Sequence, residues 1–420
     1  MTRKTLLIIG AGHEQVGAII QAQQLGHRVV VTDRNPHAPG LKHADAYELV
    51  STSDAAGNLA VAKRYAIDGV MTLGSETAVP VVAHIADALN LPGYSPFTAL
   101  AATNKNVMRD QFSKFAVPTT ESRRVRTVEE ALAFVDRFGL PIVLKPSDNS
   151  GQRGTNCVTE SVHLASALKD ALQHASDDIA IIEKFYKGPE INVTAAVHRG
   201  QIKFLSLSER VTSKTHFGIA VEHVTPAPLD DEMRLAIMDA SRRAIEAVGL
   251  TDGIAYPQVL ATKDGPKVLE IAVRIPGGHM DLVARYCSGI DLIECAIRLA
   301  MGDEDPLGHC HIHETSPALS VRFLTACDFQ NSDLTIAHIS PLDDVLQMPG
   351  VKMARLTLTA GQKMPPLENS AGRFGAVLAL GKTRDEARAR SQNAAKNFPI
   401  VFETPQKPIM PINHSMDCTI

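Results

Sequence analysis

Residues 141–154 read PIVLKPSDNSGQRG and join an apolar run to a lysine and a glycine-rich loop. The apolar run predicts a strand that ends near Lys145. Glycines allow backbone N–H groups to close on phosphate oxygens, and a lysine adds positive charge for the same anion. The stretch is not a P-loop, because its lysine precedes the loop. On these residues alone, a phosphate-binding loop and a β-turn with an exposed basic residue are equally good interpretations.

A predicted hairpin at residues 256–278, YPQVLATKDGPKVLEIAVRIPGG, carries a second polar pattern. A two-residue turn at 264–265 sends Gln258 and Glu270 to opposite faces, whereas a three-residue turn at 263–265 pairs them directly. An amide oxygen and a carboxylate about 5 Å apart on one face suit a magnesium nucleotide. The alternative interpretation is a solvent-facing polar stripe.

Between these two segments, IIEKFYKGPE at 181–190 places two acids seven residues apart, Glu183 and Glu190. A strand end followed by a short turn can present edge backbone groups to a base and a carboxylate to ribose hydroxyls. Taken alone, solvated acids on a strand edge are the better interpretation.

The amino-terminal stretch 6–17, LLIIGAGHEQVG, resembles the start of a dinucleotide-binding domain. Gly10 and Gly12 fit the G-x-G-x-x-G fingerprint, and Asp33 ends the second predicted strand. The third glycine position holds Gln15, which weakens the dinucleotide interpretation. Apolar runs alternate with helical patterns over the first hundred residues, and this alternation predicts a parallel sheet.

Composition excludes several classes of function. The chain has 420 residues, 42 basic and 46 acidic, and its net charge of -4 gives no electrostatic case for nucleic acid. No apolar run reaches the roughly 20 residues of a membrane span. Six scattered cysteines without a CxxC pair suit a reducing cytoplasm. We expect the histidine-rich run at 309–313 to be a polar strand edge without metal.

These segments, in this order, resemble the ATP-grasp superfamily over essentially the whole chain. The similarity is to its carboxylate–amine ligase branch, which includes carbamoyl-phosphate-synthetase-like enzymes and L-amino acid ligases. The resemblance implies a multidomain fold of α/β and α+β parts, in which the Rossmann-like pre-ATP-grasp domain does not bind NAD. The implied segments are the pre-ATP-grasp domain at 1–103, an ATP-grasp domain of two α+β subdomains at 104–309 with a flexible lid at about 118–186, a strand-rich C-terminal lid module at 310–405, and a tail at 406–420.

The resemblance also implies roles for individual residues. The ATP-binding set is Lys105 and Lys145 at the phosphates, Ser150, Gly151 and Gly154 in the closing loop, Glu183, Lys184 and Phe185 at the adenine, and Glu190 at the ribose. The metal ligands are Gln258 and Glu270, for magnesium or manganese. The catalytic set is Arg274, Lys145 and Arg153, and the substrate-binding set is Arg210, His216, Arg274, Gly277, Gly278 and His279. Arg373 is expected to face the site.

The implied reaction joins a small carboxylate, an amino acid in our interpretation, to an amine. ATP phosphorylates the carboxylate, and the amine displaces phosphate from the acyl phosphate to form an amide. We expect a cytoplasmic homodimer. The family usually has asparagine two residues after the second metal ligand, where this chain has Ala272. Two alternatives stay open: a carbamoyl-phosphate-synthetase-like enzyme that phosphorylates a carboxylate or carbamate, and a nucleotide-binding protein with weak turnover.

Overall fold

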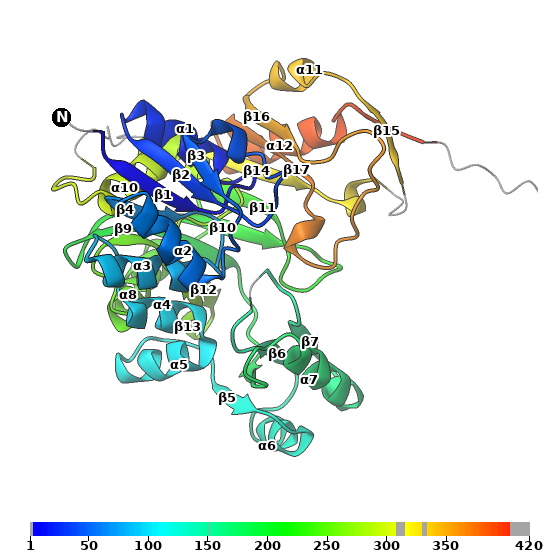
Figure 1. Cartoon of the computed structure of the whole chain (residues 1–420). Helices are drawn as coiled ribbons and strands as arrows, with labels where there is room; N and C mark the ends of the chain where they lie inside the picture. The colour runs from blue at the N-terminus through cyan, green and yellow to red at the C-terminus, as the bar shows by residue number, and fades with distance from the viewer. Residues whose placement is uncertain (1–2, 150, 308–315, 330–333, 404–420) are drawn as a thin grey trace, which may run out of the picture.

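The computed structural model describes residues 3–149, 151–307, 316–329 and 334–403. Three larger sheets and one two-stranded sheet make up a mixed α/β fold, as predicted (Figure 1). No helix in these ranges is both long enough and apolar enough to cross a membrane.

The first hundred residues form a parallel sheet of order β3-β2-β1-β4, which confirms the Rossmann-like prediction. β1 is buried along its whole length, as expected for a parallel strand covered on both faces. The strands are β1 (Thr5–Ile9), β2 (Arg28–Thr32), β3 (Ala46–Glu48) and β4 (Gly69–Thr72). The helices are α1 (Val16–Gln24), η1 (Leu41–His43), α2 (Ala55–Arg64), α3 (Val79–Leu89) and α4 (Pro96–Thr103).

The glycine turn after β1 is filled by the protein itself. Gly10 has a φ of +99°, and a Cβ atom placed on it would lie 3.3 Å from the side-chain carbon Cδ of Gln15. The Gln15 amide donates a hydrogen bond to the carbonyl of Leu73. The Asp33 carboxylate accepts from the N–H of Ala11 at 2.9 Å. That this domain does not bind a dinucleotide stays a prediction.

The second sheet, which we call the lid sheet, is antiparallel with order β5-β8-β6-β7 and lies at one end of the molecule (Figure 1). Thr127 and Glu130 form a capping box, which starts α6. The elements are β5 (Ser122–Val125), α6 (Val128–Phe138), β6 (Ile142–Pro146), β7 (Asn156–Val158), η2 (Ser161–His163), α7 (Leu164–Gln173) and β8 (Ala180–Lys184).

The third sheet, the large sheet, has eight strands in the order β13-β12-β9-β10-β11-β14-β17-β16. It runs across the predicted boundary at 309–310, because β11 pairs with β14. Its strands are β9 (Glu190–His198), β10 (Gln201–Thr212), β11 (Ala220–Thr225), β12 (Gly253–Thr262), β13 (Gly265–Ala272), β14 (Ala318–Leu324), β16 (Val351–Leu356) and β17 (Gly375–Gly381). The remaining elements are α5 (Lys105–Lys114), α8 (Asp231–Ala247), α9 (Met280–Ser288), α10 (Leu292–Ala300), η3 (Ala326–Asp328), β15 (Ile336–Ile339), α11 (Asp343–Leu346), η4 (Ser370–Gly372), α12 (Arg384–Lys396) and β18 (Ile400–Phe402).

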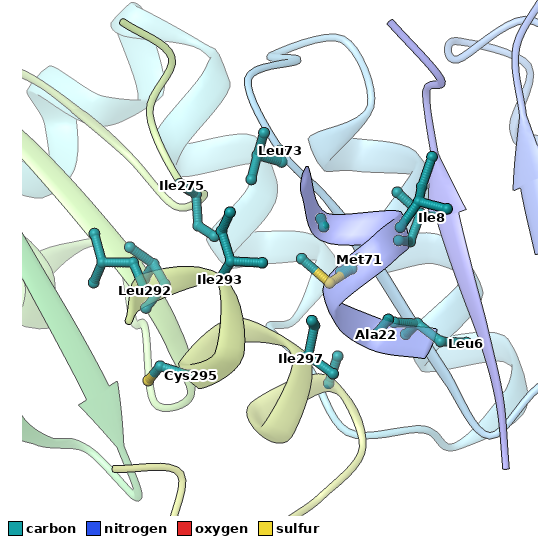
Figure 2. Close-up of a cluster of buried hydrophobic side chains, with 14 of the residues drawn as sticks. Leu6, Ile8, Ala22, Met71, Leu73, Ile275, Leu292, Ile293, Cys295 and Ile297 are labelled. Atoms are coloured by element: carbon teal, nitrogen blue, oxygen red, sulfur yellow. The ribbon is translucent and has the colours of Figure 1, made fainter. Parts of the chain in front are cut away.

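One hydrophobic core joins the amino-terminal sheet to the rest of the chain (Figure 2). Ile8 and Met71 of the parallel sheet belong to the same buried cluster as Ile293 of α10. An isolated parallel bridge pairs Leu73 with Ile275, just after β13. The loops after β1 and β4 are therefore held beside the end of β13, where the predicted site residues lie.

Candidate functional site

Three adjoining cavities lie among the lid sheet, the large sheet and the carboxyl-terminal segment. The central cavity has a volume of about 230 Å³. The lid cavity, of about 100 Å³, shares Lys105, Gln258 and Glu270 with it. The C-terminal cavity, of about 160 Å³, shares Ser370 and Arg373 with the central cavity.

The hairpin β12–β13 pairs Gln258 with Glu270, so the predicted pairing is confirmed. Neither of the two turns considered, at 264–265 and at 263–265, is present, because Thr262 pairs with Gly265 around a two-residue turn at 263–264. A β-bulge at Leu269 inserts one extra residue into β13 and shifts the register. The bulge, and not a longer turn, therefore places Gln258 opposite Glu270.

Glu270 has no ion pair within the described part of the chain. Desolvation in the cavity would raise the pKa of its carboxyl group, but the nearby positive charges outweigh this effect and lower the pKa. The largest of these contributions come from Lys105 and Lys145. The carboxylate is thus held ionised by its surroundings while its oxygens remain available to a ligand.

Glu183 is held very differently. Its carboxylate contacts the Arg109 guanidinium at 2.6 Å and the Lys145 ammonium at 2.8 Å, and it is only 3% exposed. Burial would raise the pKa of Glu183, but these two cations lower it to about 2. The same arginine donates to the carbonyl of Leu269 in the bulge at 2.6 Å. Glu183 therefore fixes Lys145 on the lid sheet and links that sheet to the hairpin.

Lys105 lies at the start of α5, where the side chain of Asn104 caps the helix. Its backbone N–H donates to the carbonyl of Ser147 at 2.7 Å, and its ammonium donates to the carbonyl of Asn149 at 2.6 Å. Desolvation lowers the pKa of Lys105, and the charge of Glu270 opposes that shift. Lys105 and Lys145 both line the lid cavity, as the prediction requires.

The segment predicted at the adenine is arranged differently from a strand edge. β8 lies between β5 and β6, so the edge position expected for residues 183–185 is wrong. The N–H of Lys184 donates to the carbonyl of Glu121 at 3.0 Å, and that of Phe185 donates to Pro141 at 3.3 Å. Neither Lys184 nor Phe185 is among the residues that line the lid cavity.

Apolar side chains that were not predicted instead line the lid cavity. Val143 of β6, Leu269 of β13 and Phe217 lie on its walls. Glu190, predicted at the ribose, also lines this cavity and forms an ion pair with Arg210 at 2.5 Å. Alternation along β6 could have indicated Val143 once Lys145 was chosen, because the two residues share a face.

The glycine loop is only partly in contact with the cavities. Gly151 and the adjacent Gln152 line both the central and the lid cavity. The carbonyl of Gly151 accepts from the N–H of Ser370 at 3.2 Å. Gly154 is buried against His174, and Arg153 is exposed; neither lines the cavities. Ser150 lies outside the described residues.

Of the two predicted substrate contacts on β10 and the loop after it, only Arg210 lines the central cavity. Arg210 is 8% exposed, and its guanidinium also donates to the carbonyl of Gly218 at 2.7 Å. Burial would lower the pKa of Arg210, but the charge of Glu190 raises it. His216 does not line the cavity, and its Nδ1 atom lies 2.9 Å from the Thr215 hydroxyl.

Arg274 lines the central cavity and has an acidic partner that the sequence did not reveal. Two nitrogens of its guanidinium contact the Glu76 carboxylate at 3.0 and 2.7 Å. Glu76 follows β4, so the amino-terminal sheet supplies a residue to this cavity. The two residues are 198 positions apart, and no local pattern marks such a pair.

The segment after Arg274 divides between two cavities. Gly277 lines the central cavity, whereas Gly278 and His279 line the C-terminal cavity. Arg373 lines both, as expected for a residue that faces the site. Its guanidinium lies over the ring of Phe323 at 4.4 Å, and burial lowers its pKa to about 10.

Two further residues of the central cavity were not predicted. His223 is 3% exposed, and burial together with Arg210 and Arg373 lowers its pKa well below 6.5. It is therefore neutral at physiological pH. Tyr256 is 6% exposed, and burial raises the pKa of its hydroxyl despite the nearby arginines.

Among the described residues, no group of three or more histidine, cysteine, aspartate or glutamate side chains could hold a metal ion by itself. The histidine-rich run at 309–313 lies outside the described residues. Gln258 and Glu270 offer two hard oxygen donors, which suits magnesium when nucleotide phosphates complete the coordination.

Sequence comparison assigns most of this architecture to known domains. Residues 104–307 match the ATP binding domain of the carbamoyl-phosphate synthase L chain, residues 19–93 match the ATP-grasp N-terminal domain, and residues 335–403 match the L-amino acid ligase C-terminal domain 2.

Individual relatives have low sequence identity to this chain but align with much of its length. An uncharacterized protein of Sinorhizobium fredii is 27% identical over 80% of this chain and 68% of its own. The alanine–anticapsin ligase of Bacillus subtilis is 24% identical over 56% of this chain, and the match spans 54% of that enzyme. The match to the crystal structure of an L-amino acid ligase from Bacillus licheniformis covers 96% of this chain and 100% of the ligase chain, with a TM-score of 0.81 and 24% identity. The chain belongs to the ATP-grasp superfamily, in its carboxylate–amine ligase branch, and is an ATP-grasp ligase.

Proposed function

We propose that this ligase uses ATP to form an amide bond between a small carboxylate, an amino acid in our interpretation, and an amine. The observation that carries the proposal is the pairing of Gln258 with Glu270 beside Lys105, in a cavity that also contains Arg274. Gln258 and Glu270 offer oxygen ligands for a cation. Lys105 and Arg274 offer positively charged N–H groups for phosphate and for a carboxylate.

Lys105 and Lys145 are proposed to bind the ATP phosphates, with the Gly151 segment above them. Lys145 is held in place by Glu183, so it can bind an anion without first losing rotamer freedom. The apolar walls of the lid cavity, rather than a strand edge, are proposed to hold the adenine. The predicted roles of Lys184, Phe185, Gly154, Arg153 and Ser150 stay predictions.

Gln258 and Glu270 are proposed to hold magnesium, or manganese in its place. Glu270 fits this role because its ionised carboxylate has no ion pair among the described residues. The bound cation would neutralise charge on the phosphate that is transferred. Ala272 pairs with Tyr256 across the hairpin and cannot ligate, so we propose that water takes the position of the family's asparagine.

Arg274 is proposed to stabilise the acyl phosphate and the tetrahedral intermediate that follows. The substrate carboxylate attacks the terminal phosphorus of ATP, and ADP leaves. The amine then attacks the acyl carbon, phosphate leaves, and the amine nitrogen loses a proton. Arg274 and Lys105 would supply most of the rate enhancement by positioning the reacting groups and neutralising their negative charge. Phosphoryl transfer depends on these two effects more than on acid–base catalysis.

The test is ADP and phosphate release from magnesium ATP against a panel of amino acids, singly and in pairs, with mass spectrometry of the products. Hydroxylamine added to each single acid converts an acyl phosphate to a hydroxamate and so reports the first step alone. We expect acid-dependent hydroxamate, and a product whose mass is the sum of the two substrates less water. ATP that binds but is never consumed with any acid would contradict the proposal and favour the nucleotide-binding alternative.

Bicarbonate in the same panel separates the second alternative. A carbamoyl-phosphate-synthetase-like enzyme would release phosphate with bicarbonate alone and would ignore amino acid pairs. Localisation in the cytoplasm and assembly as a homodimer stay predictions.

A further inference from the structure

We propose that His223 is a further catalytic residue, which donates a hydrogen bond from its Nε2–H group to the oxyanion that forms when the amine attacks the acyl phosphate. Asn192 is its positioning residue, because it fixes the proton of the neutral imidazole on Nε2. The inference rests on the ligase function proposed above and adds a neutral donor to the cationic groups already assigned.

His223 lies on β11, on the wall of the central cavity. It does not line the lid cavity, where both of the proposed phosphate-binding lysines lie. Arg210, which pairs with it across β10 and β11, lines the central cavity as well. A hydrogen-bond donor at this position therefore faces the acyl end of the acyl phosphate and not the nucleotide.

Asn192 occupies one of the two ring nitrogens of His223. Its side chain is fully buried on β9, and its amide nitrogen Nδ2 lies 3.0 Å from Nδ1 of His223. The same Nδ2 lies 3.9 Å from the sulfur of Met280, and a thioether accepts hydrogen bonds but cannot donate them. The amide nitrogen is therefore the donor toward Nδ1. A neutral imidazole whose Nδ1 accepts a hydrogen bond carries its proton on Nε2.

The other ring nitrogen of His223, Nε2, is available to a ligand. It forms no hydrogen bond within the part of the chain that the structure describes, and it is not among the described side-chain atoms that are wholly buried without a partner. A Cβ atom placed on Gly278 would lie 3.1 Å from Nε2. The glycine at this position therefore leaves the space beside Nε2 open.

The groups around His223 keep its ring neutral. Two guanidinium groups lie near it, those of Arg210 on β10 and of Arg373 after η4, and His279 lies near it before the start of α9. Burial and these three groups lower the pKa of His223 well below 6.5. A neutral imidazole can donate a hydrogen bond to a carbonyl oxygen and stabilise the negative charge that develops there, without giving up its proton.

The proposed role belongs to the second step of the reaction. The lone pair of the amine forms the C–N bond, and the electron pair of the carbonyl π bond moves to the oxygen, where it accepts the hydrogen bond from Nε2 of His223. The carbonyl then forms again, the bond between the acyl carbon and the phosphate oxygen breaks, and the proton lost by the nitrogen leaves with the phosphate. His223 keeps its own proton throughout.

The first experiment observes the ring directly and needs no substrate. In the full chain labelled with ¹⁵N in its histidine side chains, the NMR signals of His223 are those that are absent from the His223→Gln variant. We expect a neutral ring with its proton on Nε2 between about pH 6 and pH 8. A charged ring in this interval, or a proton on Nδ1, would overturn the inference whatever the activity of the protein.

The second experiment compares the two steps in variants of His223, with ATP and the acid found in the hydroxamate assay. His223→Leu removes the N–H group at similar volume, and we expect kcat for amide formation to fall about 100-fold, with a much smaller fall in hydroxamate yield and little change in the KM for the acid. His223→Gln carries an N–H group on its side-chain amide and should recover about tenfold of this loss.

His338→Leu is the matched control, since His338 is exposed on β15 and lines none of the three cavities. It should leave the rates of both steps unchanged. Thermal unfolding of each variant shows whether it is folded.

The third experiment reverses the hydrogen bond to Nδ1. In Asn192→Asp a carboxylate accepts from Nδ1–H and raises the pKa of His223; above that pKa the proton lies on Nδ1, and Nε2 can no longer donate. The rate of amide formation in this variant, divided by that in the unchanged protein, should therefore fall as the pH rises. The ratio cancels the titration of the amine itself. A ratio that does not change with pH would overturn the role of Asn192.

The outcomes separate this inference from the ligase proposal. Equal losses of amide and hydroxamate in His223→Leu, with no recovery in His223→Gln, would overturn the catalytic role of His223 and leave the ligase proposal intact. Absence of hydroxamate with every acid in the unchanged protein would refute the ligase proposal and the catalytic role with it, whereas the NMR experiment tests the position of the ring proton in either case.

Discussion

Glu183 on the lid sheet and Glu270 on the large sheet face the same positive charges, yet the protein treats them differently. Glu183 is saturated by direct contacts to Arg109 and Lys145, whereas Glu270 has no ion pair in the described ranges. Both carboxyl groups have lowered pKa values, so both are ionised at neutral pH. A carboxylate satisfied by its own protein stabilises structure, and one that is ionised but unpaired is available to a ligand.

The largest expected effect follows from removing the unpaired acid. Glu270→Gln takes a negative charge from the proposed magnesium site and leaves Gln258 with a neutral partner. We expect the rate of ADP formation to fall about 100- to 1,000-fold, as for loss of one electrostatic contact in a transition state. Magnesium ATP should also raise the unfolding temperature of the Glu270→Gln variant less than it raises that of the unchanged protein.

Asp264→Asn is the control for that comparison, because Asp264 is an exposed acid in the turn of the same hairpin. It should retain activity and the stabilisation by magnesium ATP. Unimpaired turnover in Glu270→Gln would show that Glu270 is not a metal ligand.

Replacement of Glu183, the acid with two ion pairs, should lower the stability of the protein more than it weakens ligand binding. Glu183→Gln leaves Arg109 and Lys145 without their countercharge, and such a loss costs about 3 kcal/mol of unfolding free energy. Urea denaturation measures this change, and Glu160→Gln, an exposed acid of the same part of the chain, should change it little. An unfolding free energy in Glu183→Gln equal to that of the unchanged protein would contradict a structural role.

The dependence on pH sharpens the same test. The pKa of Glu183 falls from 4.5 to about 2 on folding, so its stabilisation is complete above pH 4.5 and is lost as the pH falls toward 2. The difference in stability between the unchanged protein and Glu183→Gln should therefore narrow over that interval. A difference that stays constant down to pH 2 would mean that the carboxylate charge is not its cause.

Local pattern was sufficient for much of the fold and for part of the site. Alternating strands and helices predicted the parallel sheet. The sequence offered the pairing of Gln258 with Glu270 as one of two registers, and the structure has that pairing for a different reason, a bulge instead of a longer turn. The bulge at Leu269 could not be read from the sequence, because an extra residue in a strand leaves no compositional mark.

The rest of the site depends on contacts between distant segments. The Glu76–Arg274 pair exists only because the shared core brings the amino-terminal sheet beside the end of β13. His216 had suitable chemistry in a plausible loop, but the loop holds it away from the lining of the central cavity. Residue type therefore identified candidates, and tertiary structure selected among them.

The smallest expected effect concerns Ala272, the departure from the family pattern beside Glu270. Ala272→Asn adds a hard oxygen donor on the same hairpin, and one added ligand contact of about 1 kcal/mol lowers a dissociation constant roughly fivefold. We expect the magnesium concentration for half-maximal ADP formation to fall about two- to fivefold, with little change in the maximal rate. Ala272→Leu controls for size, because leucine fills a similar volume without an oxygen in this nearly buried position. If Ala272→Asn and Ala272→Leu shift the magnesium dependence equally, packing rather than ligation is the cause. The asparagine side chain would then not replace the water that we propose as a magnesium ligand.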